Sequence, residues 1–325
     1  MRIAIFGQQA FGKSVLEAFL AFLDRGDEVA VVFCAPTKPG ARPDPLAEAA
    51  QARGVTLHQL PSLRGPEAAE ALRAANVDIA VMAYVLQFAP QSLVNIPPHG
   101  TIQYHPSLLP LYRGPSSINW PIIRGDTQTG LTVFRPTDGL DEGPVILQKT
   151  VGIEPDDTLG TVYFERLFPL GVAAMLEAAD LVVAGKHTEV VQNESQASYE
   201  GWCKDAEARI NWHQHVDAIY NLIRGCNPAP GAWTTWNGRK LRIFDARKIP
   251  ARKLADVAGK PGEIVAIGEK SVIVAAQGGS IELLKVRLDG SDKVAAPTFA
   301  ADNQVVPGST LGTALEAATP QPEPA

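Results

Sequence analysis

The chain has 325 residues, of which 46% are hydrophobic and 20% charged, a globular composition whose length favours two domains. Its 29 Lys and Arg against 35 Asp and Glu give a net charge of −6 without a visible basic stripe, which argues against partners bound through phosphate groups. Three dispersed cysteines exclude a fully paired disulfide framework, and neither a signal peptide nor a membrane-spanning apolar run is apparent. We therefore expect a cytoplasmic protein.

Short apolar runs alternate with helical patterns through the first half of the chain, which is typical of βαβ units. Buried strands are predicted at Arg2–Phe6, Glu28–Phe33, Val55–Leu57, Asp78–Ala83 and Thr101–His105. Helices are predicted between them at Lys13–Leu23, Pro45–Arg53 and Pro66–Ala75. The predicted fold class is α/β, with a Rossmann-like, mostly parallel sheet flanked by helices.

The second half of the chain has a different pattern of predicted strands and helices. Two further strands, Leu131–Phe134 and Pro144–Val151, are joined by the acidic turn Thr137–Gly143, and a long helical stretch runs from about Thr158 to Val183. After it come one helix at His215–Arg224 and several short β-type runs separated by turn residues, which indicate a small, OB-like β-barrel. We thus predict a first domain at 1–190, a linker at 191–202, a barrel domain at 203–310 and a disordered tail at 311–325.

Residues Gly7 to Ser14 match the P-loop pattern G-x-x-x-x-G-K-S/T, between a predicted strand and a predicted helix. A P-loop protein also needs a carboxylate at the end of another core strand to hold Mg²⁺, but the strand Asp78–Ala83 is followed by Tyr84. The other interpretation is that Gly7 and Gly12 serve a tight turn and that Lys13 is a solvated residue of the first helix. A P-loop nucleotide-binding protein stays open as an alternative.

A histidine, His105, ends a predicted core strand, and Pro106 and Pro110 keep the following loop out of helical geometry. Ligands bind at the carboxyl ends of the strands in doubly wound sheets, so His105 is a candidate site residue. The turn Thr137–Gly143 carries three carboxylates between two apolar strands. If those strands lie beside the one that ends at His105, a carboxylate can face the imidazole and fix its tautomer.

Several segments around these residues carry a family resemblance: His105–Pro110, Tyr112–Gly114, Ile118–Trp120 and Asp138–Gly143. Together they resemble the 10-formyltetrahydrofolate-dependent formyltransferases, which include methionyl-tRNA formyltransferases. The resemblance is greatest to the N-terminal hydrolase domain of 10-formyltetrahydrofolate dehydrogenase. It covers about residues 1–290 and continues through Phe168–Pro169, Asp156–Thr158, Tyr199–Gly201, Ile210–Trp212, Ile223–Gly225 and Pro230–Trp233.

The resemblance implies that 10-formyltetrahydrofolate (tetrahydrofolate as product) is the co-substrate and that no metal is needed. It implies that His105, with the Gln103 amide nearby, stabilises negative charge on the formyl oxygen. It implies that Asp141 keeps His105 protonated and accepts the proton of the nucleophile. The implied folate-binding residues are Gln87, Phe88, Ala89, Ser107, Leu108, Leu109, Pro110, Asp138, Gly139 and Leu140.

Two departures from the family bear on the formyl acceptor. The transferases carry Asn where this chain has Gln103, and the segment 35–44, which corresponds to their basic tRNA-binding loop, is short, with only Lys38 and Arg42 positive. With the net charge of −6, this predicts water or a small amine as the acceptor and no tRNA. Methionyl-tRNA formyltransferase activity and a catalytically silent folate-binding protein are the alternatives within the resemblance.

Overall fold

The computed structural model describes residues 1–21, 26–252 and 258–312 and divides into two compact units. The first unit consists of Met1–Ser117, Gln128–Gly152 and Tyr163–Gly201. The second unit combines Ile118–Thr127 and Ile153–Val162 with the described residues from Trp202 onward. The end of the predicted helix Lys13–Leu23 and the predicted tail from residue 313 lie outside the described residues.

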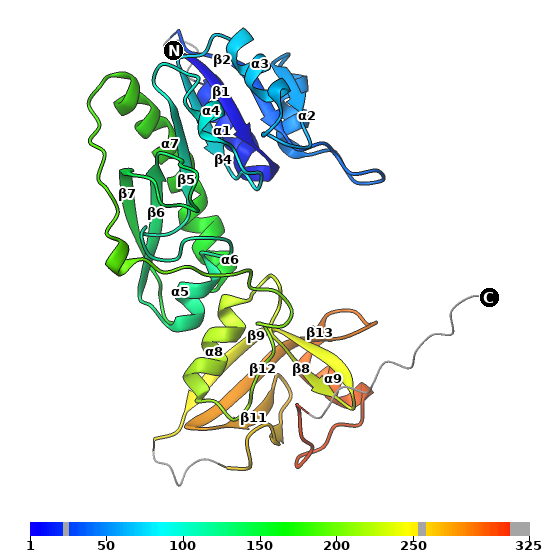
Figure 1. Ribbon diagram of the computed structural model, residues 1–325. Coiled ribbons are helices and arrows are strands. Elements are labelled where there is room, and N and C mark those ends of the chain that lie inside the picture. Colours follow the sequence, from blue (N-terminus) through cyan, green and yellow to red (C-terminus); the bar gives the residue numbers. More distant parts are fainter. Residues whose placement is uncertain (22–25, 253–257, 313–325) are drawn as a thin grey trace, which may run out of the picture. The chain divides into compact units, whose positions relative to one another are not determined.

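A seven-stranded sheet forms the centre of the first unit, in the order β3-β2-β1-β4-β5-β6-β7 (Figure 1). The strands are β1 (Arg2–Gly7), β2 (Glu28–Cys34), β3 (Thr56–Gln59), β4 (Ile79–Ala83), β5 (Thr101–His105), β6 (Gln128–Phe134) and β7 (Val145–Gly152). Pairing is parallel from β3 through β5, whereas β6 is antiparallel to both β5 and β7. The predicted Rossmann-like, mostly parallel sheet is therefore confirmed.

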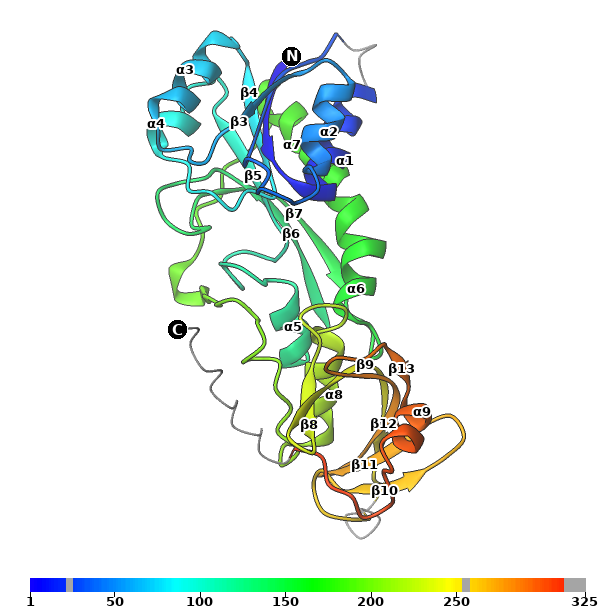
Figure 2. The ribbon, with the colours of Figure 1, turned by 90° about the vertical axis from the view of Figure 1, so that its right-hand side faces the viewer.

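Helices cover both faces of this sheet. They are α1 (Gln9–Ala21), α2 (Pro45–Ala52), α3 (Pro66–Ala74), α4 (Gln91–Val94) and α7 (Phe168–Val183). Side chains of a strand alternate between its faces: Ala4 and Phe6 of β1 join an apolar cluster with Leu72 of α3, while Ile3 is fully buried towards the other face. Figure 2 shows α3 and α4 on one side of the sheet and α1, α2 and α7 on the other. Because both faces are covered, the central strands β1, β2 and β4 read as nearly continuous apolar runs in the sequence.

The helical stretch predicted from Thr158 to Val183 consists of three pieces: α6 (Leu159–Thr161), the π-helical turn Val162–Leu167 and α7. A capping box starts it, since Thr158 Oγ1 accepts from Thr161 N (3.2 Å) and Thr161 Oγ1 accepts from Thr158 N (2.9 Å). The boundary between the two units falls at the π-helical turn. Hydrophobic periodicity predicts the helix but carries no signal for this local change of winding.

A six-stranded antiparallel sheet forms the second unit, in the order β10-β11-β12-β9-β8 with β13 paired to β12. Its elements are α5 (Asn119–Arg124), α8 (Val216–Gly225), β8 (Trp233–Trp236), β9 (Arg239–Pro250), β10 (Ile264–Ile267), β11 (Val272–Ala276), β12 (Gly279–Leu288), β13 (Val294–Ala295) and α9 (Ala296–Asp302). In the described part of this sheet, the outer strands β8 and β10 are not paired with each other. The antiparallel sheet is thus present, and the closed OB-like barrel stays a prediction.

Helix α8 ties two earlier segments of the chain to the second unit. The Asn119 side chain of α5 donates from Nδ2 to Gly225 O (2.9 Å), and Arg224 Nη1 donates to Asp157 O (3.1 Å). The segment expected as a linker, 191–202, belongs to the first unit as far as Gly201; within it, Ser198 O accepts from Arg113 N (2.9 Å).

The three cysteines are free and buried. Cys34 ends β2 in the first unit, whereas Cys203 and Cys226 lie in the apolar core of the second unit with their Sγ atoms 3.7 Å apart. None of the helices in the described part of the chain combines the length and the apolar character needed to cross a membrane.

Candidate active site

His105 is the last residue of β5, at the carboxyl edge of the parallel strands. Its side chain is buried, and Nε2 lies 2.8 Å from the backbone oxygen of Tyr112. A carbonyl oxygen only accepts, so Nε2 carries a proton and the ring orientation is fixed by this bond. The other ring nitrogen, Nδ1, is left to face the acidic turn.

Asp141 lies in the turn between β6 and β7 and faces His105. Its Oδ2 is 3.5 Å from His105 Nδ1 and accepts a hydrogen bond from Gly114 N (2.9 Å). Both side chains are 8% exposed, so water screens their interaction poorly. The 3.5 Å separation is longer than a normal N–H···O bond, so Nδ1 is not committed to Asp141 and can face a third group.

The three carboxylates of the turn have different surroundings. Asp138 Oδ1 accepts from Gln91 N (3.3 Å), and Glu142 Oε1 accepts from the Tyr199 hydroxyl (3.1 Å). Only Asp141 of these three is buried. Its position beside the imidazole follows from the antiparallel pairing of β5 with β6, where His105 is opposite Thr132.

Gln103 is half-buried on β5, two residues before His105. A separation of two residues along a strand places both side chains on the same face of the sheet. Among the described residues, the Gln103 amide makes no hydrogen bond, so its donors and its oxygen are available to a ligand.

The expected folate-binding residues lie on three segments of the first unit. In the segment 87–89, the Gln87 amide donates to Leu60 O (2.9 Å), Ala89 is buried, and the exposed Phe88 ring lies under the guanidinium of Arg64, 4.6 Å from its centroid. Gln91, just beyond it, donates from Nε2 to Pro136 O (3.0 Å). Hydrogen bonds thus bring the segment 87–91 next to the segment that carries Asp138, Gly139 and the exposed Leu140.

Hydrogen bonds from Thr132 of β6 and Gln148 of β7 hold the segment 107–110. Thr132 Oγ1 donates to Ser107 O (2.7 Å) and accepts from Leu109 N (3.1 Å), while Gln148 of β7 donates to Leu109 O (2.7 Å). The buried Ser107 hydroxyl donates to Leu111 O (2.6 Å), and Leu108 and Pro110 are half-buried. The polar backbone groups of this loop are therefore fixed before any ligand arrives.

The segment that matches the P-loop is built differently from a phosphate cradle. Helix α1 begins at Gln9, whose N–H faces both carboxylate oxygens of Asp44 (3.0 and 2.9 Å). A Cβ on Gly7 would lie 2.5 Å from Ala83 O, so this glycine permits close packing of β1 on β4. Lys13 lies inside α1, 44% exposed and 3.8 Å from Glu17. The geometry supports the tight-turn interpretation, because a carboxylate occupies the N–H that a phosphate would need.

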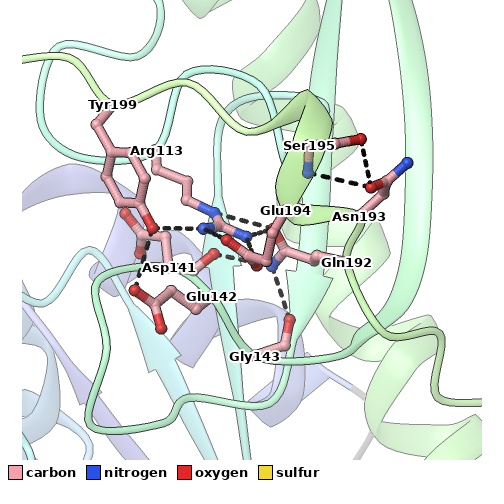
Figure 3. Close-up of polar contacts among 9 residues, drawn as sticks. All are labelled: Arg113, Asp141, Glu142, Gly143, Gln192, Asn193, Glu194, Ser195 and Tyr199. Atoms are coloured by element: carbon pink, nitrogen blue, oxygen red, sulfur yellow. Dashed lines mark hydrogen bonds and ion pairs between the residues drawn. The ribbon is translucent and has the colours of Figure 1, made fainter.

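Sequence reasoning gave no role to a polar cluster beside Asp141 that contains Arg113, Gln192, Glu194 and Tyr199 (Figure 3). Arg113 is fully buried. The only signal in the sequence was that Tyr112–Gly114 and Tyr199–Gly201 belong to the segments of the family resemblance.

Two family models match this chain. Residues 1–179 match the formyl transferase family, and residues 203–304 match the formyl transferase C-terminal domain. The human mitochondrial 10-formyltetrahydrofolate dehydrogenase is 38% identical over 279 residues, which is 82% of this chain and 30% of the dehydrogenase. The chain thus spans under a third of the length of that relative.

A second relative matches over nearly its whole length. The methionyl-tRNA formyltransferase of Geotalea daltonii is 33% identical over 317 residues, 96% of this chain and 98% of that protein. Our expectation that tRNA is not the acceptor therefore finds no support in the comparisons.

Two solved structures share the fold. The N-formyltransferase of Helicobacter canadensis, in complex with folinic acid and dTDP-3-aminofucose, has a TM-score of 0.66 at 18% identity and covers 87% of this chain and 98% of its own. HypX of Aquifex aeolicus, in complex with tetrahydrofolic acid, has a TM-score of 0.64 at 19% identity and covers 93% of this chain and 47% of its own. The similarity of these two structures concerns the fold alone. From the matched family and its close relatives, the chain belongs to the formyltransferase family.

Proposed function

We propose that this chain moves the formyl group of 10-formyltetrahydrofolate to water or to a small amine. The observation that carries the proposal is the buried contact of His105 Nδ1 with Asp141 Oδ2 (3.5 Å) at the carboxyl edge of the sheet. Both groups are oriented by second partners, Tyr112 O and Gly114 N. Acyl transfer needs such a pair, because a proton must leave the nucleophile while negative charge develops on an oxygen.

The roles are divided by atom. Nε2 of His105 is committed to Tyr112 O, so in the doubly protonated ring, whose charge Asp141 balances, Nδ1 is the nitrogen that donates to the formyl oxygen. The Gln103 amide, on the same face of β5, is a second donor to that oxygen. Asp141 accepts the proton of the attacking water or amine.

The bonds balance without a further reactant. With water, the new bond joins the water oxygen to the formyl carbon, and the bond from that carbon to N10 breaks. One proton of the water passes by way of Asp141 to N10, so the products are tetrahydrofolate and formic acid, which ionises. With an amine, the new bond is C–N and the product is a formamide.

Two of the expected folate-binding residues are exposed apolar side chains. Phe88 and Leu140 are 41% and 54% exposed, and a pterin ring gains by covering such side chains. Residues 107–110 form the third expected segment, held in place by Thr132 and Gln148. These features support folate binding by the three segments expected from the sequence.

Transfer to methionyl-tRNA is the second candidate. It is favoured by the relative from Geotalea daltonii, which matches this chain over 96% of its length. Against it stand the net charge of −6 and a segment 35–44 with only Lys38 and Arg42 positive.

An assay of tetrahydrofolate formation from 10-formyltetrahydrofolate tests both candidates in three arms: without an added acceptor, with a panel of small primary amines, and with methionyl-tRNA. We expect turnover in the first or second arm, carried by His105 and Asp141. Turnover that depends on methionyl-tRNA would replace our proposal with the second candidate. No turnover in any arm, together with tight binding of tetrahydrofolate, would identify a silent folate-binding protein.

A further inference from the structure

Asp141, the residue that faces His105, has an unusual backbone conformation. Its φ of 55° lies in the left-handed region, which non-glycine residues rarely adopt. Such a conformation persists only where the surroundings hold it. The turn Thr137–Gly143 therefore needs external support at Asp141.

Gln192 supplies that support from a distant part of the chain. It is buried, and its Nε2 donates to Asp141 O (2.8 Å) and to Gly143 O (2.7 Å), on both sides of Glu142. The amide has two N–H donors, and these two carbonyls use both. Gln192 thus clamps the turn through its backbone without bonding to the Asp141 carboxylate.

Arg113 fixes the orientation of the Gln192 amide. Its Nε (3.1 Å) and Nη2 (2.8 Å) both donate to Gln192 Oε1, which leaves the NH₂ group pointing at the turn. Glu194 takes two more donors at 2.9 and 2.7 Å, and the Tyr199 hydroxyl takes the fifth. All five N–H donors of a fully buried guanidinium are therefore used (Figure 3).

A second hydrogen-bonded connection joins the cluster to the turn. Tyr199 donates from its hydroxyl to Glu142 (3.1 Å), so Asp141, Glu142 and Gly143 are all bonded, directly or in one step, to groups that Arg113 holds. Glu194 compensates the buried charge, and its hydrogen bonds with Arg113 lower the pKa of the Glu194 carboxyl. The cluster therefore stays charged and intact at neutral pH.

The backbone of Arg113 connects the same cluster to His105. Its two neighbours, Tyr112 and Gly114, hold His105 Nε2 and Asp141 Oδ2 respectively. Gly114 has a φ of 91°, and a Cβ there would lie 2.6 Å from Glu200 O, so the tripeptide cannot shift easily. Residues 112–114 thus bond to His105, to Asp141 and to Gln192.

We infer that Gln192 is a positioning residue, held by Arg113, that sets the distance and angle between Asp141 and His105. This inference rests on the proposed function, in which Asp141 accepts a proton. A misplacement of about 1 Å at a reacting group can cost on the order of 10²-fold in rate. Releasing the clamp should therefore slow the formyl chemistry although Gln192 touches neither reacting side chain.

Gln192→Glu is the test, because it keeps the size and the acceptor for Arg113 but turns an oxygen towards the two carbonyls. We expect kcat to fall by about 10- to 100-fold. Gln196→Glu is the matched control: it is the same change in the same segment on an exposed side chain, and it should keep the rate of the wild type. If melting curves show that Gln192→Glu is unfolded, Gln192→Met takes its place, since methionine has no donor and only a weakly accepting sulfur.

The second measurement repeats the change in an Asp141→Asn background. A residue that acts through Asp141 should then cost less than about threefold, because the group it positions is already disabled. An equal loss in both backgrounds, or a wild-type rate in Gln192→Glu beside a slow Asp141→Asn, overturns the inference and leaves the proposed function intact. A wild-type rate in Asp141→Asn removes the role of Asp141 and the inference with it.

Discussion

His105 and Asp141 should behave as one unit, since each is oriented towards the other by a separate backbone contact. We expect His105→Ala or Asp141→Ala to lower kcat for formyl release by about 10²- to 10⁴-fold. The double variant should lose little more than either single variant, because groups that act together are not additive. Rates measured on all three variants check this, and additive losses would contradict the pairing.

Gln103 offers a separate test of the oxyanion partners. If its amide donates to the formyl oxygen, Gln103→Leu should cost about 10²- to 10³-fold in kcat, as for other single donors of this kind. Gln103→Asn is the control, since it keeps the donor on a shorter side chain and should retain or raise transfer to an amine. A loss below about tenfold in Gln103→Leu would leave His105 as the sole donor.

The site could be predicted from the sequence only in part. A histidine at a strand end and an acidic turn between two later strands were visible, and the family resemblance assigned roles to them. The role of Gln192 was not visible, because nothing in a sequence marks a glutamine whose amide bonds to a turn about 50 residues earlier, here Asp141 and Gly143. The atoms that each group uses, such as His105 Nε2 for Tyr112 O, depend on the folded loop.

At the scale of elements, α7 packs so closely on β5 that a glycine is needed. A Cβ on Gly171 would lie 2.7 Å from the ring of Tyr104, which is buried and stacked on Phe11. Alanine gains about 1 kcal/mol in helix propensity over glycine, but overpacking of a core costs about 1–3 kcal/mol. We expect Gly171→Ala to lower the free energy of unfolding, measured in urea.

Gly201→Ala is the control for this prediction, because a Cβ there meets nothing within 4 Å. It should change the free energy of unfolding by less than about 0.5 kcal/mol. If Gly171→Ala were stabilising, helix propensity would outweigh the contact with Tyr104.

The long, regular elements were predicted to within a few residues, whereas the short helices were missed. Strands such as β1 and β4 are buried on both faces and read as nearly unbroken apolar runs. The helices α4, α5 and α9 have at most seven residues, too few for a helical period to stand out. Membership of Ile118–Thr127 and Ile153–Val162 in the second unit depends on contacts with α8, which no local pattern contains.

At the scale of the whole molecule, the five tryptophans all belong to the second unit. They are Trp120, Trp202, Trp212, Trp233 and Trp236. Tryptophan fluorescence therefore reports the unfolding of that unit separately from the first.

This signal can follow an ion cluster of the second unit. Asp205 bonds to Lys240 and Arg242 of β9, and the hydrogen bond from Lys240 lowers the pKa of the Asp205 carboxyl. A lowered pKa in the folded state means that the carboxylate adds stability above its ordinary pKa and loses it as the pH falls. Since the side chain is half-exposed, we expect Asp205→Asn to cost only about 0.2–1 kcal/mol at pH 7.

The difference between Asp205→Asn and the wild type should shrink as the pH falls below about 4. Urea unfolding followed by tryptophan fluorescence at several pH values measures it. Asp292→Asn, at an exposed carboxylate without a side-chain bond to the described residues, should show no such trend. A difference that stayed constant with pH would mean that Asp205 acts by packing and not by charge.

The composition of the second unit has a consequence for biosynthesis. Ile118–Thr127 and Ile153–Val162 leave the ribosome before α8, the helix against which Asn119 and Asp157 are bonded. At about 5–20 residues per second, these segments wait several seconds for their partner. During that interval Ile123, which packs against the core of the second unit beside Gly225 of α8, has no cover, so the nascent chain presents an apolar surface to chaperones until α8 emerges.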